Sequence, residues 1–283
     1  MGRHRRAGHV RPCEPARHPH LPDPGGHPMT VSLATWLLGR ELTRQRNHAG
    51  LSTRDAALRL GVSSATLNRS ENGLRPFSDH EVGAALATYT ADSDARRRAT
   101  RLLLRQAHDP AGAWWMAAHE DVVHMLETAS TAITEFSPTT VPPSARTTTY
   151  ATALGAATTP ASPRLDGHPS PLRLIILDAT ALRRPVGGHH AMATQLRHLA
   201  LVATSVGASV RVIPPHRPHP PIEAFTAYHL PDRAPAVRTG TPEVLAEDHH
   251  ITSRIDTLLA AADDETTSTR LILRIADDHD RHH

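Results

Sequence analysis

The stretch from Leu51 to Arg75, LSTRDAALRLGVSSATLNRSENGLR, decides the fold of the front of this 283-residue chain. It predicts two short helices joined by a tight turn. Ser52 is the expected cap of the first helix, and Asp55, three residues later, completes an S-x-x-D capping box. Gly61 follows at the point where a helix favours a left-handed residue, so we expect the first helix to end there.

The second helix of the pair begins after Ser63, its expected cap, and ends at Asn72 and Gly73. The apolar side of the two helices is formed by Ala56, Ala57, Leu60, Val62 and Leu67. The side chains left facing outward on the second helix are Ser64, Ala65, Thr66, Asn68 and Arg69. Short polar groups and one arginine suit contact with base edges and phosphates in a major groove.

Charge is unevenly distributed along the chain. All 31 basic residues are arginine, which together with the 24 prolines indicates a coding bias rather than chemistry. Residues 1–109 contain 17 arginines against 10 acidic residues, and the remainder contains 14 against 18. A basic front half and a mildly acidic back half favour a nucleic-acid-binding domain joined to a domain with another task.

The composition also bears on compartment and partners. Cys13 is the one cysteine, so no internal disulfide is expected. No apolar run approaches the roughly 18 residues of a membrane-spanning helix. The N-terminus is rich in Arg, His and Pro and does not resemble a signal peptide. We therefore expect a cytoplasmic protein without a membrane partner.

Three segments are predicted along the chain. Residues 1–30 contain hardly a periodic apolar position, so we expect a disordered extension, and we hypothesise that Met29 is the genuine start. Helices predicted over residues 32–49, 78–89 and 93–107 join the helix pair in a five-helix, all-α domain over residues 31–109. In the last of these helices, the Arg96–Arg98 run is interpreted as a solvated face. The third segment, residues 110–283, is interpreted as a regulatory or partner-binding domain.

The sequence from residue 110 to residue 283 changes character. Helices are predicted at 113–133, 192–205 and 242–262, the last with Pro242 in its first turn, and a helical turn at 178–184. Strands are predicted at 172–177, 209–213 and 224–230, residues 271–275 fit either a strand or a helix, and residues 136–170 resist assignment. This order predicts a mixed α+β domain, which places the whole chain in the α+β class.

Residues 38–76 resemble the Xre-type (lambda-repressor-like) helix-turn-helix family. The matching positions are Leu38-Gly-Arg-Glu-Leu42, Ala49-Gly-Leu51, Ala57, Leu60-Gly-Val-Ser63, Thr66-Leu67, Arg69 and Glu71-Asn-Gly73. The resemblance implies that Ser64, Ala65 and Arg69 read bases, and that Thr53, Ser63 and Asn72 lie near phosphates. We assign Thr66, Asn68 and Arg75 to the same DNA-binding surface.

The sequence departs from the Xre-type pattern at three positions. Thr53 stands where a glutamine is usual, and Gln45 and Ser70 stand where the family has core aliphatic residues. Losing two aliphatic side chains from a small core could cost a few kcal/mol each. We therefore expect either a marginal domain or partial exposure of these two side chains.

The back half resembles the domain that follows such a motif in actinobacterial, antitoxin-like regulators. The stretches that carry the resemblance are Ile133-Thr-Glu-Phe-Ser-Pro138 with Val141-Pro142, Leu177-Asp-Ala-Thr-Ala-Leu-Arg-Arg-Pro-Val-Gly-Gly188, and Met192 with Gln195-Leu196 and Leu199. The resemblance implies a small protein partner encoded beside the gene.

Several features of the chain admit a second interpretation. Arg69 reads bases or is an exposed helical arginine paired with an acidic neighbour, and the first is favoured. Trp114 and Trp115 are interpreted as packing anchors rather than the lining of a ligand cavity. The 22 histidines include no metal-ligand spacing, so no metal or cofactor is expected. Asp178, His189 and some serine could form a triad, but the chain lacks a G-x-S-x-G elbow, and we predict no enzymatic activity.

The sequence predicts a homodimeric transcriptional regulator that binds double-stranded DNA through its helix-turn-helix. One alternative is an antitoxin-like interaction protein whose helix-turn-helix is degenerate and has no role with DNA. Another is a repressor that responds to a small molecule.

Overall fold

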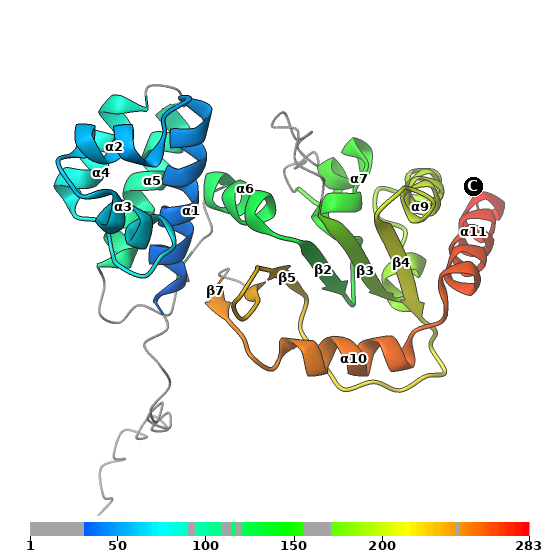
Figure 1. The fold of residues 1–283 in the computed structure, drawn as a ribbon. Coiled ribbons are helices and arrows are strands. Elements are labelled where there is room, and N and C mark those ends of the chain that lie inside the picture. Colours follow the sequence, from blue (N-terminus) through cyan, green and yellow to red (C-terminus); the bar gives the residue numbers. More distant parts are fainter. Residues whose placement is uncertain are drawn as a thin grey trace, which may run out of the picture. The chain divides into compact units, whose positions relative to one another are not determined.

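The computed structural model describes residues 31–89, 94–108, 115–116, 120–155, 171–240 and 244–282 (Figure 1). The predicted disorder of residues 1–30, the predicted domain boundary at residue 109 and the packing of the Trp114 and Trp115 side chains lie outside these residues. No helix in the described part of the chain is long and apolar enough to cross a membrane.

Five helices form the front domain, as predicted: α1 (Leu33–His48), α2 (Thr53–Leu60), α3 (Ser64–Glu71), α4 (Asp79–Thr88) and α5 (Asp94–Ala107). Serine side chains cap the first four at their N-termini, because each hydroxyl accepts a hydrogen bond from a first-turn amide. The buried core that holds the helices together includes Leu37, Leu38, Leu42, Leu60, Leu67, Phe77, Val82 and Leu103.

The helix predicted at 113–133 is wrong at both ends. The chain forms a two-residue strand, β1 (Trp115–Met116), then α6 (Glu120–Ala129), then β2 (Ala132–Ser137). Ile133 and Phe136 of β2 are buried in a sheet whose partner strands come from later in the sequence. The helical spacing of apolar residues continues past the end of α6 by chance. Pairing with strands from distant parts of the sequence makes the residues after α6 a strand instead.

The back domain is built on a seven-stranded sheet in the order β1-β7-β6-β5-β2-β3-β4. Strands β2, β3 (Leu172–Asp178) and β4 (Ala208–Ile213) run parallel to one another. Strands β5 (Phe225–His229), β6 (Ala236–Thr239) and β7 (Val244–Glu247) continue the sheet from β2 in antiparallel pairs. The predicted α+β class and its order of domains are confirmed.

Helices cover both faces of this sheet. Ile175 and Leu177 share an apolar cluster with α9 (His189–Ala203) and α11 (Glu265–Arg281), whereas Ile176 between them packs in the cluster of α10 (Ile251–Ala261). Figure 1 shows α10 on the opposite side of the sheet from α7 (Thr148–Ala153) and α9. Burial on both faces explains the apolar run Leu174–Leu177 in β3. Two shorter pieces, a 3₁₀ turn at Pro143–Ala145 and α8 (Ala179–Arg183), complete the domain.

The helix predicted at 242–262 is wrong in its first half. Val244–Glu247 forms β7, paired with β6, and the helix begins only at Ile251; Pro242 lies outside the described residues. Residues 271–275, which fit either structure, belong to α11.

The β4 edge of the sheet is closed by the start of α11. The Asp263 amide donates to the Val212 carbonyl (2.9 Å), and the Val212 amide donates to the Ser268 hydroxyl (2.9 Å). These contacts occupy the backbone groups of Val212, which are then not available to another strand.

Candidate nucleic-acid interface

The turn between α2 and α3 is set by local sequence. Gly61 has a φ of +71°, a conformation that costs glycine little, and the Val62 amide donates back to the Ala57 carbonyl (3.0 Å). Two residues later the Ser63 hydroxyl accepts from the Thr66 amide (3.0 Å) and opens α3. The predicted helix-turn-helix is therefore present.

One face of α3 is anchored and the other is open. Leu67, Ser70 and Glu71 are buried against the domain. Thr66 is half-buried, whereas the side chains that face solvent are Ser64, Ala65, Asn68 and Arg69. The side chains predicted to read bases therefore share an outward surface.

The Arg69 side chain has no hydrogen-bond or ion-pair partner among the described residues. The alternative interpretation of Arg69, as half of a surface ion pair, is therefore not supported, because no acidic side chain among the described residues binds it. Asn68 and Asn72 bind each other instead: the Asn72 amide nitrogen donates to the Asn68 side-chain oxygen (3.1 Å) and to its carbonyl (2.8 Å). Arg69 is the residue of this face with the longest reach.

The predicted phosphate contacts lie at helix starts. Thr53 is the first residue of α2, half-buried, and Ser63 is the cap of α3. The Ser63 and Thr66 hydroxyls are 2.8 Å apart, which fixes the capping geometry. Helix N-termini carry unpaired amides and partial positive charge, both of which suit an anion.

Arg75, predicted to face DNA, has a structural role in the free chain. Its guanidinium donates to both Glu81 carboxylate oxygens (3.0 and 3.1 Å) and to the Ser70 hydroxyl (2.9 Å). Burial alone would raise the pKa of Glu81, but hydrogen bonds from Arg75 and from the Ser78 amide outweigh it and hold the pKa below its usual value. This network joins the end of α3 to the start of α4.

Of the two expectations for Gln45 and Ser70, partial exposure is wrong, because both side chains are buried. A marginal domain stays a prediction. Each is hydrogen-bonded: the Gln45 amide donates to Glu41 (2.8 Å) and to Thr100 (3.4 Å), and the Ser70 hydroxyl accepts from Arg75. Two buried polar side chains, each with its own hydrogen-bond partners, therefore stand where the Xre-type pattern has aliphatic residues.

A buried ion pair that the sequence analysis did not predict also secures α3. Arg46 of α1 binds both carboxylate oxygens of Glu71, the last residue of α3. The available signal was the position of Glu71, four residues after the buried Leu67 and therefore on the inward side of the helix.

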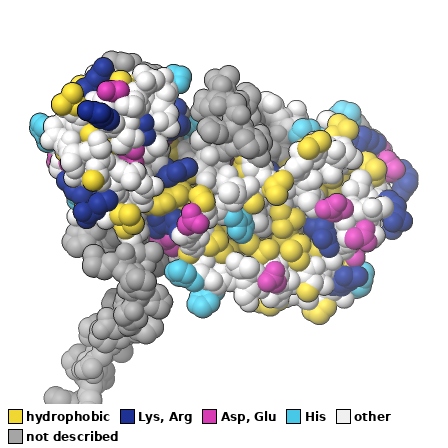
Figure 2. Space-filling model, viewed as in Figure 1, with side chains coloured by type: hydrophobic (Ala, Val, Ile, Leu, Met, Phe, Trp, Pro, Cys, Tyr) yellow, Lys and Arg dark blue, Asp and Glu magenta, His cyan; other side chains and the backbone are white. Residues whose placement is uncertain are grey.

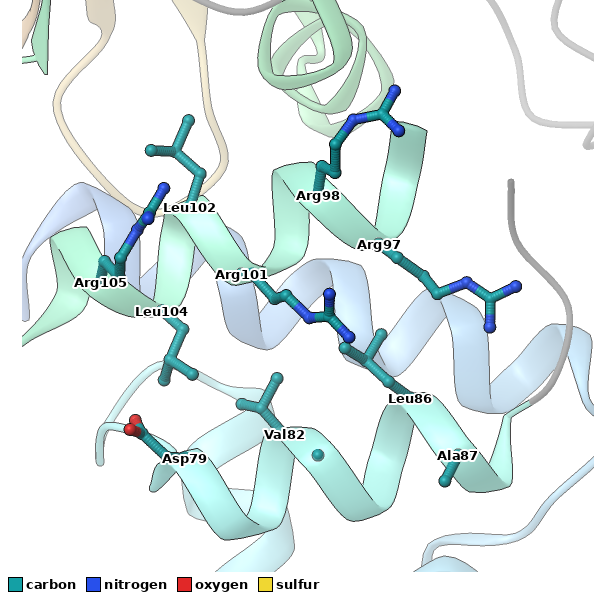
Figure 3. A pocket seen from close by; sticks show the side chains of 11 residues that line it. Asp79, Val82, Leu86, Ala87, Arg97, Arg98, Arg101, Leu102, Leu104 and Arg105 are labelled. Atoms are coloured by element: carbon teal, nitrogen blue, oxygen red, sulfur yellow. The ribbon is translucent and has the colours of Figure 1, made fainter. Parts of the chain in front are cut away.

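A groove of about 760 Å³ lies between α4 and α5 (Figure 3). Apolar side chains, among them Val82, Leu86 and Leu104, form its floor. Arginines of α5 line one side of it: Arg97, Arg98, Arg101 and Arg105, all exposed. In Figure 3 Arg101 extends over the gap between the two helices and Arg98 points away from it. Figure 2 shows further Arg side chains dispersed over the helical domain, as the positive charge of the front half suggested.

Two histidine contacts in the back domain bear on the proposed triad. His189 Nδ1 lies 2.9 Å from His279 Nδ1, and His219 Nε2 lies 3.1 Å from the Asp178 carboxylate. Asp178 and His189 therefore have different partners, and the triad considered from the sequence is not assembled. No group of three or more potential metal ligands occurs within the ranges that the structure describes.

Residues 121–274 match the profile of a family described as a domain of unknown function (DUF5753), and residues 37–99 match that of a helix-turn-helix domain. The first match spans more than half of the chain. The comparison with curated proteins found no match to this chain. Among solved structures, the clp gene regulator ClgR from C. glutamicum is 19% identical over 28% of this chain and 96% of that chain, with a TM-score of 0.22.

Proposed function

The chain belongs to the DUF5753 family and carries a helix-turn-helix domain, and from this premise we propose that it is a transcriptional regulator that binds an operator through α3. In this proposal α3 enters the major groove, while arginines and the N-terminal amides of α2 and α3 bind phosphates. We propose no enzymatic role for the chain.

The observation that carries this proposal is the asymmetry of α3. Its inward residues are fixed by packing and by the Arg46–Glu71 ion pair, while Ser64, Asn68 and Arg69 remain exposed. A rigid helix with an exposed polar face and an arginine without a partner among the described residues is what direct readout requires.

The alternative of an interaction protein with a degenerate helix-turn-helix rested on Gln45 and Ser70. Both residues are satisfied in a network that holds the helices in place. Their hydrogen bonds favour a functional helix-turn-helix over a decayed one.

We also propose that the protein acts as a homodimer, because a single helix-turn-helix buries little surface and two-fold operators bind two-fold proteins. The resemblance to antitoxin-like regulators supports a small protein partner for the back domain. Light scattering on the full chain tests the dimer: a monomeric mass at micromolar concentration contradicts it.

Fluorescence anisotropy with a duplex from the region upstream of the chain's own gene tests DNA binding. The proposal predicts tighter binding to this duplex than to a scrambled one. If a dimer contacts six or more phosphates, affinity should fall about 10³-fold or more between 50 and 200 mM salt. Equal affinity for the two duplexes together with a flat salt response would exclude the proposed function.

A further inference from the structure

The topology of the back domain marks one end of β2 as a place for a ligand. The chain builds β2, β3 and β4 in order as parallel neighbours, then returns to add β5 on the other side of β2. The strand order therefore reverses at β2. In open, mostly parallel α/β sheets, ligands bind outside the carboxyl ends of the strands at such a reversal. In this sheet β5 is antiparallel to β2, so the carboxyl end of β2 lies beside the start of β5.

A cavity of about 760 Å³ occupies this position. It is formed by the end of β2 and the residues that follow it, by the start of β5 and by the end of β6. Its volume lies within the range of sites for small organic molecules. Its polar lining includes Ser137, Thr140, Arg146, Glu223, Thr226 and Arg238.

Arg146 is the unusual member of this lining. It is half-buried, its Nε donates to the Val141 carbonyl (2.7 Å), and it has no ion-pair partner in the described part of the chain. Burial lowers the pKa of its guanidinium, against the opposing charges of Tyr150 and Glu135. An arginine remains charged even so, and a partly desolvated cation without an anion is costly.

The charge of the buried Glu135 acts on Arg146, but no ion pair joins the two side chains among the described contacts. Glu135 is held by Arg173, whose Nη1 lies 2.9 Å from its carboxylate, and by the Ser144 hydroxyl. Three other arginines of low exposure in the described part of the chain have a direct carboxylate partner: Arg46 has Glu71, Arg173 has Glu135 and Arg233 has Glu247. Arg146 instead faces a cavity.

We propose that this cavity binds a small organic molecule bearing a carboxylate or phosphate group, with the anion paired to Arg146. Hydroxyls of Ser137, Thr140 and Thr226 line the same space and can donate to the anion's oxygens. Arg238 adds a second positive charge to the lining of the cavity. Glu223 adds a negative charge, which favours ligands that also carry a hydrogen-bond donor. The proposal does not rest on the proposed binding of DNA.

Thermal unfolding of the full chain tests the site with two probes, inorganic phosphate and benzoate, each at 50 mM and compared with sodium chloride at equal ionic strength. A ligand that binds only the folded state raises the Tm, here by about 2 °C or more if its Kd is a few millimolar. Arg146→Gln should abolish this rise. Arg274→Gln, which changes an exposed arginine on α11, should keep it.

A second variant keeps the test valid if Arg146→Gln does not fold. Thr139 is exposed at the cavity, so Thr139→Glu leaves the core intact and places a negative charge beside the anion. It should also abolish the rise. Equal rises in wild type, Arg146→Gln and Thr139→Glu would mark a general salt effect and overturn the proposal, as would the absence of any rise over chloride in the wild-type chain.

Discussion

Arg46 on α1 and Glu71 at the end of α3 form a buried ion pair with two contacts, Nε to Oε1 at 2.6 Å and Nη2 to Oε2 at 3.1 Å. Arg46 also donates to the Leu51 carbonyl (2.8 Å). One guanidinium group therefore connects three parts of the domain: α1, α3 and the loop that precedes α2. α3 is thereby fixed at its C-terminal end, in addition to the backbone hydrogen bonds that close it there, from the Asn72 amide to the Asn68 carbonyl and from the Leu74 amide to the Arg69 carbonyl.

Removing one partner of this pair should destabilise the front domain strongly. Glu71→Ala leaves the Arg46 charge buried without an anion, and we expect a loss of about 3–5 kcal/mol in the free energy of unfolding. Urea unfolding followed by circular dichroism measures it. The double variant Arg46→Met/Glu71→Leu should lose less, and a loss below about 1 kcal/mol in Glu71→Ala would refute a structural role for the pair.

The Glu81 carboxylate should make stability depend on pH in the acid range. Its folded pKa lies below the ordinary value of 4.5, so its contribution is present above that value and is lost as pH falls through the folded pKa. Glu81→Gln should therefore lose about 1–3 kcal/mol relative to wild type at pH 7, and progressively less below pH 4.5. A difference that stays constant between pH 7 and pH 3 would contradict this assignment.

Two glycines in helices should respond oppositely to the same substitution. A Cβ on Gly39 of α1 would lie 2.6 Å from the Ser70 carbonyl oxygen, whereas a Cβ on Gly83 of α4 would have no neighbouring atom within 4 Å. Gly39→Ala should cost about 1–3 kcal/mol because α1 and α3 must separate. Gly83→Ala should stabilise by about 0.5–1 kcal/mol through helix propensity. Urea unfolding of both variants decides; equal effects would contradict the close approach of α1 and α3.

Gln195 of α9 should be essential to the back domain. It is fully buried; its oxygen accepts from the Thr147 amide (2.7 Å) and its nitrogen donates to the Ala145 carbonyl (2.7 Å). Gln195→Ala removes both bonds and leaves a cavity, so thermal unfolding should show a loss of about 2–4 kcal/mol. Thr194→Ala, at the exposed neighbouring position, is the control and should change stability by under about 1 kcal/mol.

The front domain could be predicted from sequence because its signals are local. Ser52, Gly61 and Ser63 each act on backbone groups within four residues, and the structure has the helix ends where these residues place them. Strands β2 and β7 could not be predicted in the same way. Their partners come from distant parts of the chain, and Val244–Glu247 has a pattern that a helix would also accept.

The polar core explains the remaining error. Gln45 and Ser70 looked like defects because a pattern of residue types does not show hydrogen-bond partners. The cavity beside Arg146 was hidden for the same reason, since its walls come from three strand ends that only the sheet brings together. The outward set on α3, in contrast, followed from helical spacing alone.

The affinity of Arg69→Ala for the operator duplex tests the central claim most directly. Measured beside wild type and Arg274→Ala, with folding checked by circular dichroism, Arg69→Ala should bind the specific duplex more weakly by about 1–3 kcal/mol, while Arg274→Ala binds like wild type. Unchanged affinity in a folded Arg69→Ala protein would contradict the account, because the outward face of α3 would then not be the surface that meets DNA.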